Sequence, residues 1–246
     1  MSKKKEDSSV GMRLNKFIAH SGVCSRRQAA ELVKTGKIKV NGTVLKEPGY
    51  QLEAGDRVEY KGKVLAIEGK KVYLLMNKPK NTITTLKDEK GRRTVHDLIK
   101  SKVEERVYPV GRLDRNTLGL LVLTNDGDLA QRLAHPSYEI QKYYEVTLDK
   151  VVTEKHIEQI KAGLELEDGP TPVDAVHFLD EKDKTQVGIK IHIGRNRIVR
   201  RIFEHLGYQV KRLDRTYYAG LTKKDLPRGW FRHLTEQEVI MLKHFI

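Results

Sequence analysis

A short apolar run stands between two turn-forming segments near the middle of the chain. Residues 118–123 are apolar apart from one glycine, residues 111–116 before them are mostly polar, and Asn-Asp-Gly follows at 125–127. Because a compact apolar run bounded by turn residues is typical of a buried strand, the pattern predicts a strand at 118–123. Further strands are predicted at 73–76, 144–148 and 209–218, and near 173–179 and 187–193.

Helix starts are marked by side chains that can cap a first turn. Ser25 followed by Gln28 is a capping box, and Thr235 followed by Glu238 is a second one. Thr153 can cap a helix in a similar way. From the spacing of apolar positions, helices are predicted around 14–18, 26–33, 95–99, 129–134, 154–162 and 196–206, and after 235.

Together these elements predict an α+β protein with two folded parts. Residues 1–11 are charged and almost free of apolar side chains, which is typical of a disordered tail. Residues 12–70 form a small α/β module, in which Asn-Gly at 41–42 predicts a hairpin. Its last part, 63–71, lacks a hydrophobic pattern and is expected to be a linker. Residues 71–246 are expected to hold a mixed sheet with one face covered by helices.

The charge of the chain narrows the class of partner. Its 246 residues carry 47 Lys+Arg against 33 Asp+Glu, a formal net charge of +14. Such an excess predicts attraction to a polyanion, and to nucleic acid first. No apolar run approaches the roughly 20 residues of a membrane-spanning helix, and no lipidation motif or signal peptide is recognisable, so no membrane partner is expected. A single cysteine, Cys24, excludes an internal disulfide and fits the reducing cytoplasm, the expected location.

Basic residues are concentrated in the N-terminal module. Arg26 and Arg27 stand in the first turn of a predicted helix, where the helix dipole and the free amide groups already favour an anion. Positive side chains there cost helix stability, which points to a phosphate partner; an ordinary solvated basic face is the alternative. The predicted RNA-binding residues are Arg13, Lys16, Arg26, Arg27, Lys37 and Lys39.

One carboxylate, Asp114, lies in the loop before the predicted central strand, between Arg112 and Arg115. Positive neighbours favour its ionised form, and an ionised carboxylate can act as a nucleophile or a base. A surface ion pair is the alternative interpretation. The same tetrapeptide, Arg-Leu-Asp-Arg, recurs at 212–215. Because Asp214 lies inside a predicted strand, we expect it to be structural and to pair with a neighbouring arginine.

No motif for a metal or a nucleotide cofactor is present. The chain has neither Gly-x4-Gly-Lys-Ser/Thr, nor Gly-x-Gly-x-x-Gly, nor His-Glu-x-x-His. Its 9 histidines are scattered, and one cysteine cannot build a sulfur-ligated zinc site. We therefore expect chemistry without a metal and without a cofactor.

Several separate segments resemble the motifs of RNA pseudouridine synthases, in the order of that family. These segments are residues 111–121, 124–127, 142–146 and 194–201. The most similar branch is the ribosomal RNA group of the RsuA and RluB type. Residues 22–27 and 39–42 resemble the alpha-L RNA-binding module of a small-subunit ribosomal protein. The resemblance covers nearly the whole chain after the N-terminal tail, and it implies a mainly antiparallel sheet in a catalytic domain at 71–246.

The resemblance also implies roles for individual residues. Asp114 matches the catalytic carboxylate of the family. Tyr144 matches the active-site tyrosine that stacks on the target base, and Arg200 matches the basic residue that pairs with the carboxylate. On the same predicted helix as Arg200, Arg195 or Arg197 is expected to contact phosphates.

The resemblance also implies which residues surround the target base. Ile191 matches an apolar residue that lines the uracil pocket, and Arg112 is expected to fill the gap left by the flipped base. If the segment around Tyr144 is a strand, its neighbour Tyr143 points to the opposite face. Ile193 stands where the family pattern has Glu, so the edge of the pocket is expected to differ.

The implied function is site-specific isomerisation of uridine to pseudouridine in ribosomal RNA, after the base is flipped out of its stack. The Asn-Arg-x-Val-Arg-Arg form of the last motif favours large-subunit RNA. Free ribosomal RNA or a ribosome assembly particle is the expected partner, and the protein is expected to be a monomer. A non-enzymatic RNA-binding or ribosome-assembly factor that keeps the fold is the main alternative. A glycoside hydrolase is a weaker one, because such enzymes usually need two carboxylates and the motif offers one.

Overall fold

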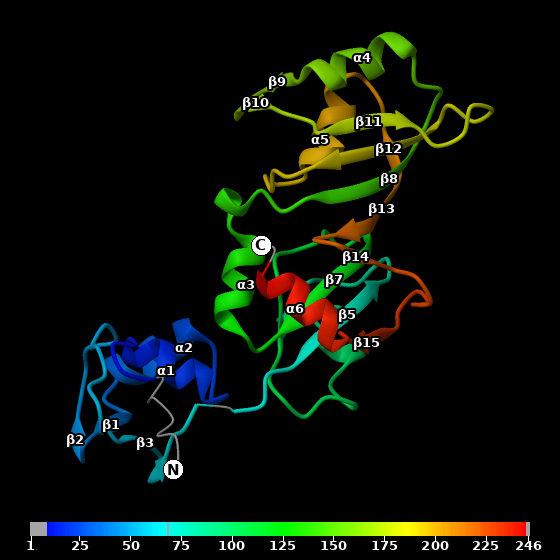
Figure 1. Cartoon of the computed structure of the whole chain (residues 1–246). Helices are drawn as coiled ribbons and strands as arrows, with labels where there is room; N and C mark the ends of the chain where they lie inside the picture. The colour runs from blue at the N-terminus through cyan, green and yellow to red at the C-terminus, as the bar shows by residue number, and fades with distance from the viewer. Residues whose placement is uncertain (1–8, 68, 245–246) are drawn as a thin grey trace. The chain divides into compact units, whose positions relative to one another are not determined.

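The computed structural model describes residues 9–67 and 69–244 (Figure 1). The chain divides into two compact units, Met1–Lys71 and Val72–Ile246, and each unit is described by itself. Most of the predicted N-terminal tail lies outside the described residues.

The first unit packs two helices, α1 (Leu14–His20) and α2 (Arg26–Lys34), against a small antiparallel sheet. The predicted capping box is present at the start of α2. The Gln28 amide donates to Ser25 Oγ at 3.3 Å, and the Ser25 amide donates to Gln28 Oε1 at 3.1 Å. The sheet has the order β2-β1-β3-β4, with β1 at Ile38–Val40, β2 at Thr43–Val44, β3 at Val58–Tyr60 and β4 at Lys63–Val64.

Two segments that were expected to be a linker and a disordered tail take part in the packing of this module. Lys63 and Val64 form β4 and pair with β3, so the expected linker does not begin at residue 63. This pairing needs no hydrophobic pattern, because its hydrogen bonds come from the backbone. At the other end, the Gly11 amide donates to the Leu52 carbonyl oxygen at 2.7 Å, so the end of the expected tail is bonded to the module.

The second unit is built on a mixed sheet, which has nine strands among the described residues, and of their pairings only that of β13 with β7 is parallel. The α+β fold class and the mainly antiparallel sheet are therefore confirmed. Seven strands follow the order β11-β12-β8-β13-β7-β5-β15, while β14 pairs with β13 and β6 with β7. The strands are β5 (Tyr73–Lys78), β6 (Tyr108–Pro109), β7 (Leu118–Thr124), β8 (Lys142–Leu148), β11 (Ala175–Phe178), β12 (Gln186–Ile191), β13 (Val210–Tyr218), β14 (Leu221–Thr222) and β15 (Phe231–His233).

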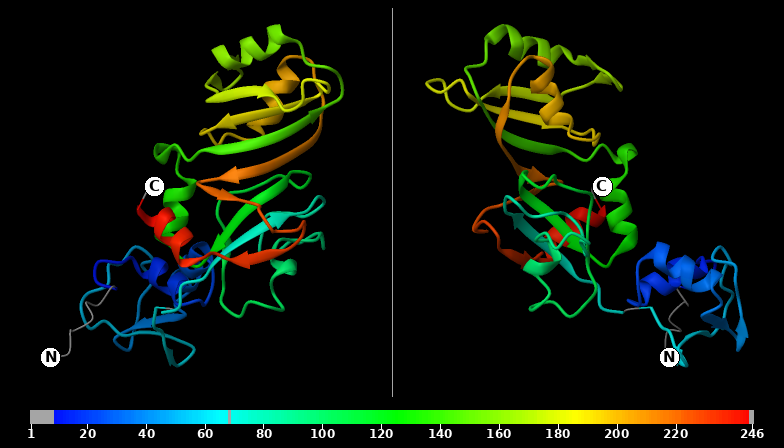
Figure 2. Two further views of the ribbon diagram at one scale, coloured as in Figure 1. Left: turned by 45° about the vertical axis from the view of Figure 1, so that its right-hand side comes forward. Right: turned by 180° about the vertical axis from the view of Figure 1, so that it is seen from behind.

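The central strand β7 is apolar on both faces, and both faces are covered. Leu121 and Leu123 belong to one core together with side chains of α4 and α5. Leu120 and Val122 belong to a second core with side chains of α3 and α6. The expectation of one covered face is therefore wrong here, because consecutive apolar residues of a strand must be buried on both sides. The helices are η1 (His96–Leu98), α3 (Gly127–Ala134), η2 (Pro136–Tyr138), α4 (Glu154–Ala162), α5 (Ile198–His205) and α6 (Glu236–His244), and Figure 2 shows them from two further sides.

The parallel contact of β7 with β13 is unusually close at Gly119. This glycine has φ +107°, and a Cβ atom on it would lie 2.2 Å from the carbonyl oxygen of Arg215. Only glycine fits such an approach. The start of β7, and the loop that carries Asp114 before it, are thereby fixed beside β13.

Candidate active site

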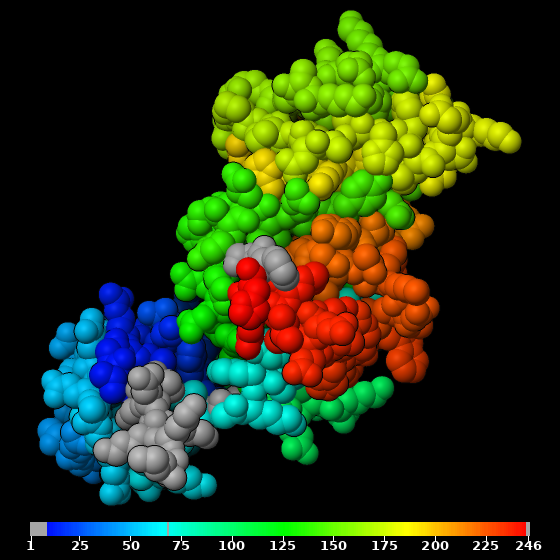
Figure 3. All heavy atoms as spheres, in the orientation of Figure 1, coloured from blue at the N-terminus to red at the C-terminus, as the bar shows by residue number. Residues whose placement is uncertain are grey.

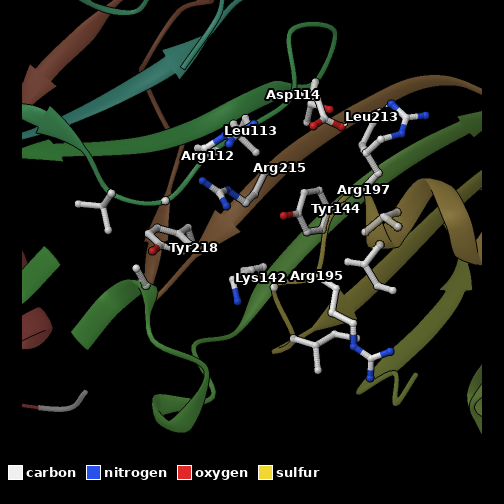
Figure 4. Close-up of a pocket in the computed structure, with 18 of the residues that line it drawn as sticks. Arg112, Leu113, Asp114, Lys142, Tyr144, Arg195, Arg197, Leu213, Arg215 and Tyr218 are labelled. Carbon is white, nitrogen blue, oxygen red and sulfur yellow. Dashed lines mark ion pairs between the residues drawn. The ribbon is translucent and has the colours of Figure 1, made fainter. Parts of the chain in front are cut away.

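The second unit contains a cavity of about 150 Å³ beside the start of β7 (Figure 4). This volume is below the roughly 300–1,000 Å³ of pockets for drug-sized ligands, so it suits a group the size of one nucleobase. Its lining comes from the loop 110–117, the end of α3, the start of β8, residues 193–199 and β13.

The loop that carries Asp114 is held from the neighbouring strand β5. The fully buried Lys78 ammonium donates to the carbonyl oxygens of Arg115 at 3.3 Å and Thr117 at 2.8 Å. Burial lowers the pKa of Lys78 to about 8; nearby Asp114 opposes this shift and Arg228 adds to it. The lysine therefore fixes the backbone of the loop rather than its carboxylate.

Asp114 faces two arginines from the segment around α5. Its side chain is 33% exposed, and Oδ2 lies 3.8 Å from Arg197 Nη1 and 3.9 Å from Arg200 Nε. Burial lowers the pKa of Arg200 and neighbouring Arg197 lowers it further, while Asp114 opposes both. The structure thus brings Asp114 and Arg200 together and adds Arg197, which sequence reasoning had assigned to phosphate contacts.

Helix α5 begins at Ile198 and not at residue 196. The reason is Arg197, whose φ of 49° and ψ of 28° are left-handed and cannot continue a right-handed helix. Such a conformation costs a non-glycine residue on the order of 1–3 kcal/mol. Arg195 and Arg197 therefore precede the helix instead of lying on it, and Arg197 turns its side chain toward Asp114 (Figure 4).

Arg195 donates hydrogen bonds to a hairpin that was not predicted from the sequence. Strands β9 (Leu164–Leu166) and β10 (Gly169–Thr171) form this hairpin. The Arg195 guanidinium donates to the carbonyl oxygens of Asp168 at 3.2 Å, of Gly169 at 3.0 Å and of Pro170. It also lies 3.2 Å from Asp168 Oδ1, and Arg201 pairs with the same carboxylate. Arg195 thus anchors the hairpin beside the pocket with donors that had been expected to bind phosphate.

Tyr144 and Tyr143 point to opposite faces of β8. The Tyr144 ring is 8% exposed and lines the pocket. The Tyr143 hydroxyl lies 3.0 Å from His177 Nε2 and is not part of the pocket lining. The strand alternation therefore selects Tyr144 as the tyrosine of the site.

Of the two residues predicted to surround the target base, Ile191 and Arg112, only Arg112 lines the cavity. Ile191 is fully buried in the core and does not line the cavity, whereas Ile193, past the end of β12, does. Ile191 thus lies in the packed interior behind the cavity wall, and its part in holding the base stays a prediction. Arg112 is exposed and lines the pocket.

Lys142 and Arg215 line the pocket but were not among the predicted site residues. Lys142 precedes Tyr144 by two positions on β8, so strand alternation was the signal that could have found it. Burial lowers its pKa to about 8, and the nearby Arg215 lowers it as well. Arg215 reaches the pocket through the pairing of β13 with β8, which no local signal reveals.

Asp214 is a fully buried carboxylate with three cationic partners. Its Oδ2 accepts from Arg212 at 3.1 Å, from Lys223 at 3.0 Å and from Arg228. Arg212 was an expected partner, whereas Lys223 and Arg228 come from the segment after β14, which lies at the surface in Figure 3. Arg228 also donates to the Asn77 side chain, which links Asp214 to β5.

The residues predicted to bind RNA lie in the first unit. Arg26 and Arg27 occupy the first turn of α2, as expected, and are exposed. Arg13, Lys37 and Lys39 are exposed too, whereas Lys16 on α1 is half-buried. Among the described residues, no group of three or more His, Cys, Asp or Glu is placed to hold a metal ion. No helix in the described ranges is both long and apolar enough to cross a membrane.

Comparison with known families matches both units. The family described as RNA pseudouridylate synthase matches residues 72–205, and the S4 domain matches residues 12–58. The chain is also similar to a solved structure described as a pseudouridylate synthase. The match covers 94% of this chain and 99% of the solved one, with a TM-score of 0.68 and 29% identity.

Named relatives agree with this match. The chain is 44% identical over 235 residues to "Ribosomal large subunit pseudouridine synthase B" of Bacillus subtilis, covering 94% of this chain and 95% of the relative. It is 40% identical to an RNA pseudouridine synthase of Aquifex aeolicus, over 94% and 93% of the two chains. The fold, the two matched segments and these relatives show that the chain belongs to the RNA pseudouridine synthases and carries an RNA-binding S4 domain before its catalytic unit.

Proposed function

We propose that this enzyme converts one uridine of large-subunit ribosomal RNA to pseudouridine, with Asp114 as the catalytic carboxylate. The observation that carries the proposal is the pocket itself, in which Asp114 and Tyr144 lie together and Arg197 and Arg200 face the carboxylate. The relative in Bacillus subtilis, named for the large ribosomal subunit, supports the choice of RNA.

The reaction breaks the bond from ribose to a uracil nitrogen, turns the base and rejoins it through a carbon. It therefore needs a carboxylate beside the nucleotide and a pocket that limits access of water. Asp114 meets the first need, because two arginines face its carboxylate and orient it. The cavity meets the second, since apolar side chains such as Leu113 and Ile193 form part of its wall.

The target base has to leave its stack before it can enter this pocket. Tyr144 offers a ring on which the base stacks, a contact worth roughly 1–3 kcal/mol. Arg112, exposed beside the pocket, fills the gap that the base leaves in the RNA.

The S4 domain supplies affinity for folded RNA outside the pocket. Its exposed arginines at the start of α2 are placed where a helix already favours phosphate. The proposed substrate is ribosomal RNA, free or in an assembly particle, and the proposed place of action is the cytoplasm.

The test is pseudouridine mapping of ribosomal RNA from cells that lack this protein. One site in large-subunit RNA should disappear, and the wild-type protein should restore it while Asp114→Asn does not. Asp225→Asn is the control, because Asp225 is exposed, does not line the pocket and has a left-handed backbone that asparagine adopts readily.

Each other outcome has a defined meaning. Restoration of the site by Asp114→Asn would contradict the assignment of the carboxylate. Loss of a site in small-subunit RNA would contradict the choice of RNA, and persistence of every site would contradict ribosomal RNA as the substrate.

A further inference from the structure

Two cations on one side of the pocket form no ion pair with a carboxylate of the described residues. Lys142 and Arg215 both line the cavity, and within the described residues neither forms an ion pair. Two other cations of the lining are paired, because Arg195 contacts Asp168 and Arg197 contacts Asp114. The half-buried Lys142 and the buried Arg215 thus stand apart as cations without an ion pair in the described structure.

The pairing of β8 with β13 brings these two side chains together. Arg215 lies opposite Tyr144, and Tyr218 lies opposite Lys142. A bulge between Arg215 and Tyr217 shifts the alternation, so Arg215 and Tyr218 share a face despite their odd spacing. The Arg215 guanidinium carbon lies 4.4 Å from the centre of the Tyr218 ring. Figure 4 shows Arg215, Tyr218 and Lys142 around one part of the pocket, with the Tyr144 hydroxyl turned toward it.

Both cations keep unused hydrogen-bonding capacity. The Lys142 ammonium donates to the His192 carbonyl oxygen at 2.6 Å, which uses one of its three N–H groups. Arg215 Nε donates to the Leu120 carbonyl oxygen at 2.9 Å, but Arg215 Nη2 is buried with no partner in the described structure. A buried donor without an acceptor, such as Arg215 Nη2, is costly, and the repulsion between Arg215 and the half-buried Lys142 adds to that cost. Such an arrangement is stabilised when an anion binds between them.

We infer that Lys142 and Arg215 form a cradle for a phosphate of the target uridine nucleotide. The inference rests on the proposed function, which brings that nucleotide into the pocket. A uracil oxygen would satisfy the donors, but only a charged group also offsets two cations. The cradle lies beside Tyr144 and away from the arginines that face Asp114 (Figure 4).

The test is a calorimetric titration of the full-length protein with uridine, uridine 5′-monophosphate and uridine 3′-monophosphate. One monophosphate should bind wild type about tenfold or more tightly than uridine, because a charge-assisted hydrogen bond is that strong. Lys142→Met, which keeps the apolar stem, should lose most of this preference. The matched control is Lys190→Met. Lys190 on β12 lies opposite Tyr143 of β8 and does not line the pocket, so this variant should keep the preference.

Arg215→Lys serves as a second variant, since it keeps the charge but not the fork of donors, and it should lose part of the preference. A thermal melt shows whether Arg215→Lys folds. If this variant does not fold, the titration of Lys142→Met alone tests the cradle. An equal preference in wild type and Lys142→Met, or no preference in wild type, would overturn the cradle. The titration needs neither turnover nor a known RNA target, so its result stands apart from the mapping that tests the proposed function.

Discussion

The tetrapeptide Arg-Leu-Asp-Arg occurs twice, at 112–115 and at 212–215, and its two carboxylates lie in different surroundings. Asp114 is partly exposed and stands 3.8 Å and 3.9 Å from two guanidinium groups. Asp214 is fully buried and accepts hydrogen bonds from three cations. The first can therefore meet a substrate, whereas the second is saturated by the protein.

Asp214→Asn is expected to lower the free energy of unfolding by about 3 kcal/mol, because it leaves buried cations without their counter-charge. Burial alone would raise the pKa of Asp214, but hydrogen bonds from Arg228 and Lys223 outweigh it and hold the pKa below its ordinary value. Its contribution is therefore complete above about pH 4 and is lost as the pH falls through the lowered pKa. Urea unfolding of wild type and variant between pH 7 and pH 3 measures both effects.

Asp225→Asn, an exposed substitution, should leave unfolding unchanged and serves as the control. Equal stability of wild type and Asp214→Asn at pH 7 would show that the three cations find other partners. A stability difference that persists unchanged at the lowest pH would contradict the assigned titration.

Among the elements, the hairpin β9–β10 depends on contacts from a distant part of the chain. Asp168 at its turn pairs with Arg195 and Arg201, which flank the start of α5. These arginines hold the pKa of Asp168 well below its usual range. The hairpin is thereby fixed to the segment that presents Arg197 to Asp114.

Asp168→Ala should release this hairpin with little change in global stability. The carboxylate is 42% exposed, and ion pairs of that kind contribute at most about 1 kcal/mol. Hydrogen exchange at 164–171 should become faster, while exchange in β7 stays as in wild type. Glu158→Ala, which removes the exposed pair with Lys161 on α4, is the matched control and should leave the hairpin protected. Unchanged exchange at 164–171 would contradict the anchoring role of Asp168.

Elements with a local signal could be predicted from the sequence. Thr153 caps α4 and Gly163 ends it, and the Asn-Gly turn at 41–42 joins β1 to β2. The hairpin β9–β10 had such a signal as well, an Asp-Gly pair at 168–169 that was overlooked. The parallel pairing of β13 with β7 and the left-handed Arg197 depend on distant contacts, so Arg215 in the pocket and the true start of α5 could not be predicted.

At the scale of the whole molecule, the excess of positive charge is shared by two units with different tasks. The pocket lies entirely in the second unit, while the S4 domain lies in the first. Phosphate contacts made by the S4 domain should add affinity that depends on salt but not on the target base.

Arg26→Ala combined with Arg27→Ala should therefore weaken RNA binding and reduce the slope of log K against log salt by about 2. Filter binding to the same ribosomal RNA fragment at several salt concentrations measures this slope. Lys46→Ala combined with Lys63→Ala removes two exposed lysines of the same unit outside the predicted set, and it should change the slope less. An equal loss in both double variants would show a diffuse basic surface instead of a defined contact.

Two of the cations that pair with Asp214 come later in the chain than Asp214 itself. A ribosome makes the chain from its N-terminus, so Asp114 is synthesised long before Lys223 and Arg228. Until those late residues emerge, Asp214 lacks two of its cations and β5 lacks the bond from Arg228 to Asn77. The nascent chain therefore cannot finish the support beneath the loop that carries Asp114 until residues 223–228 have been made.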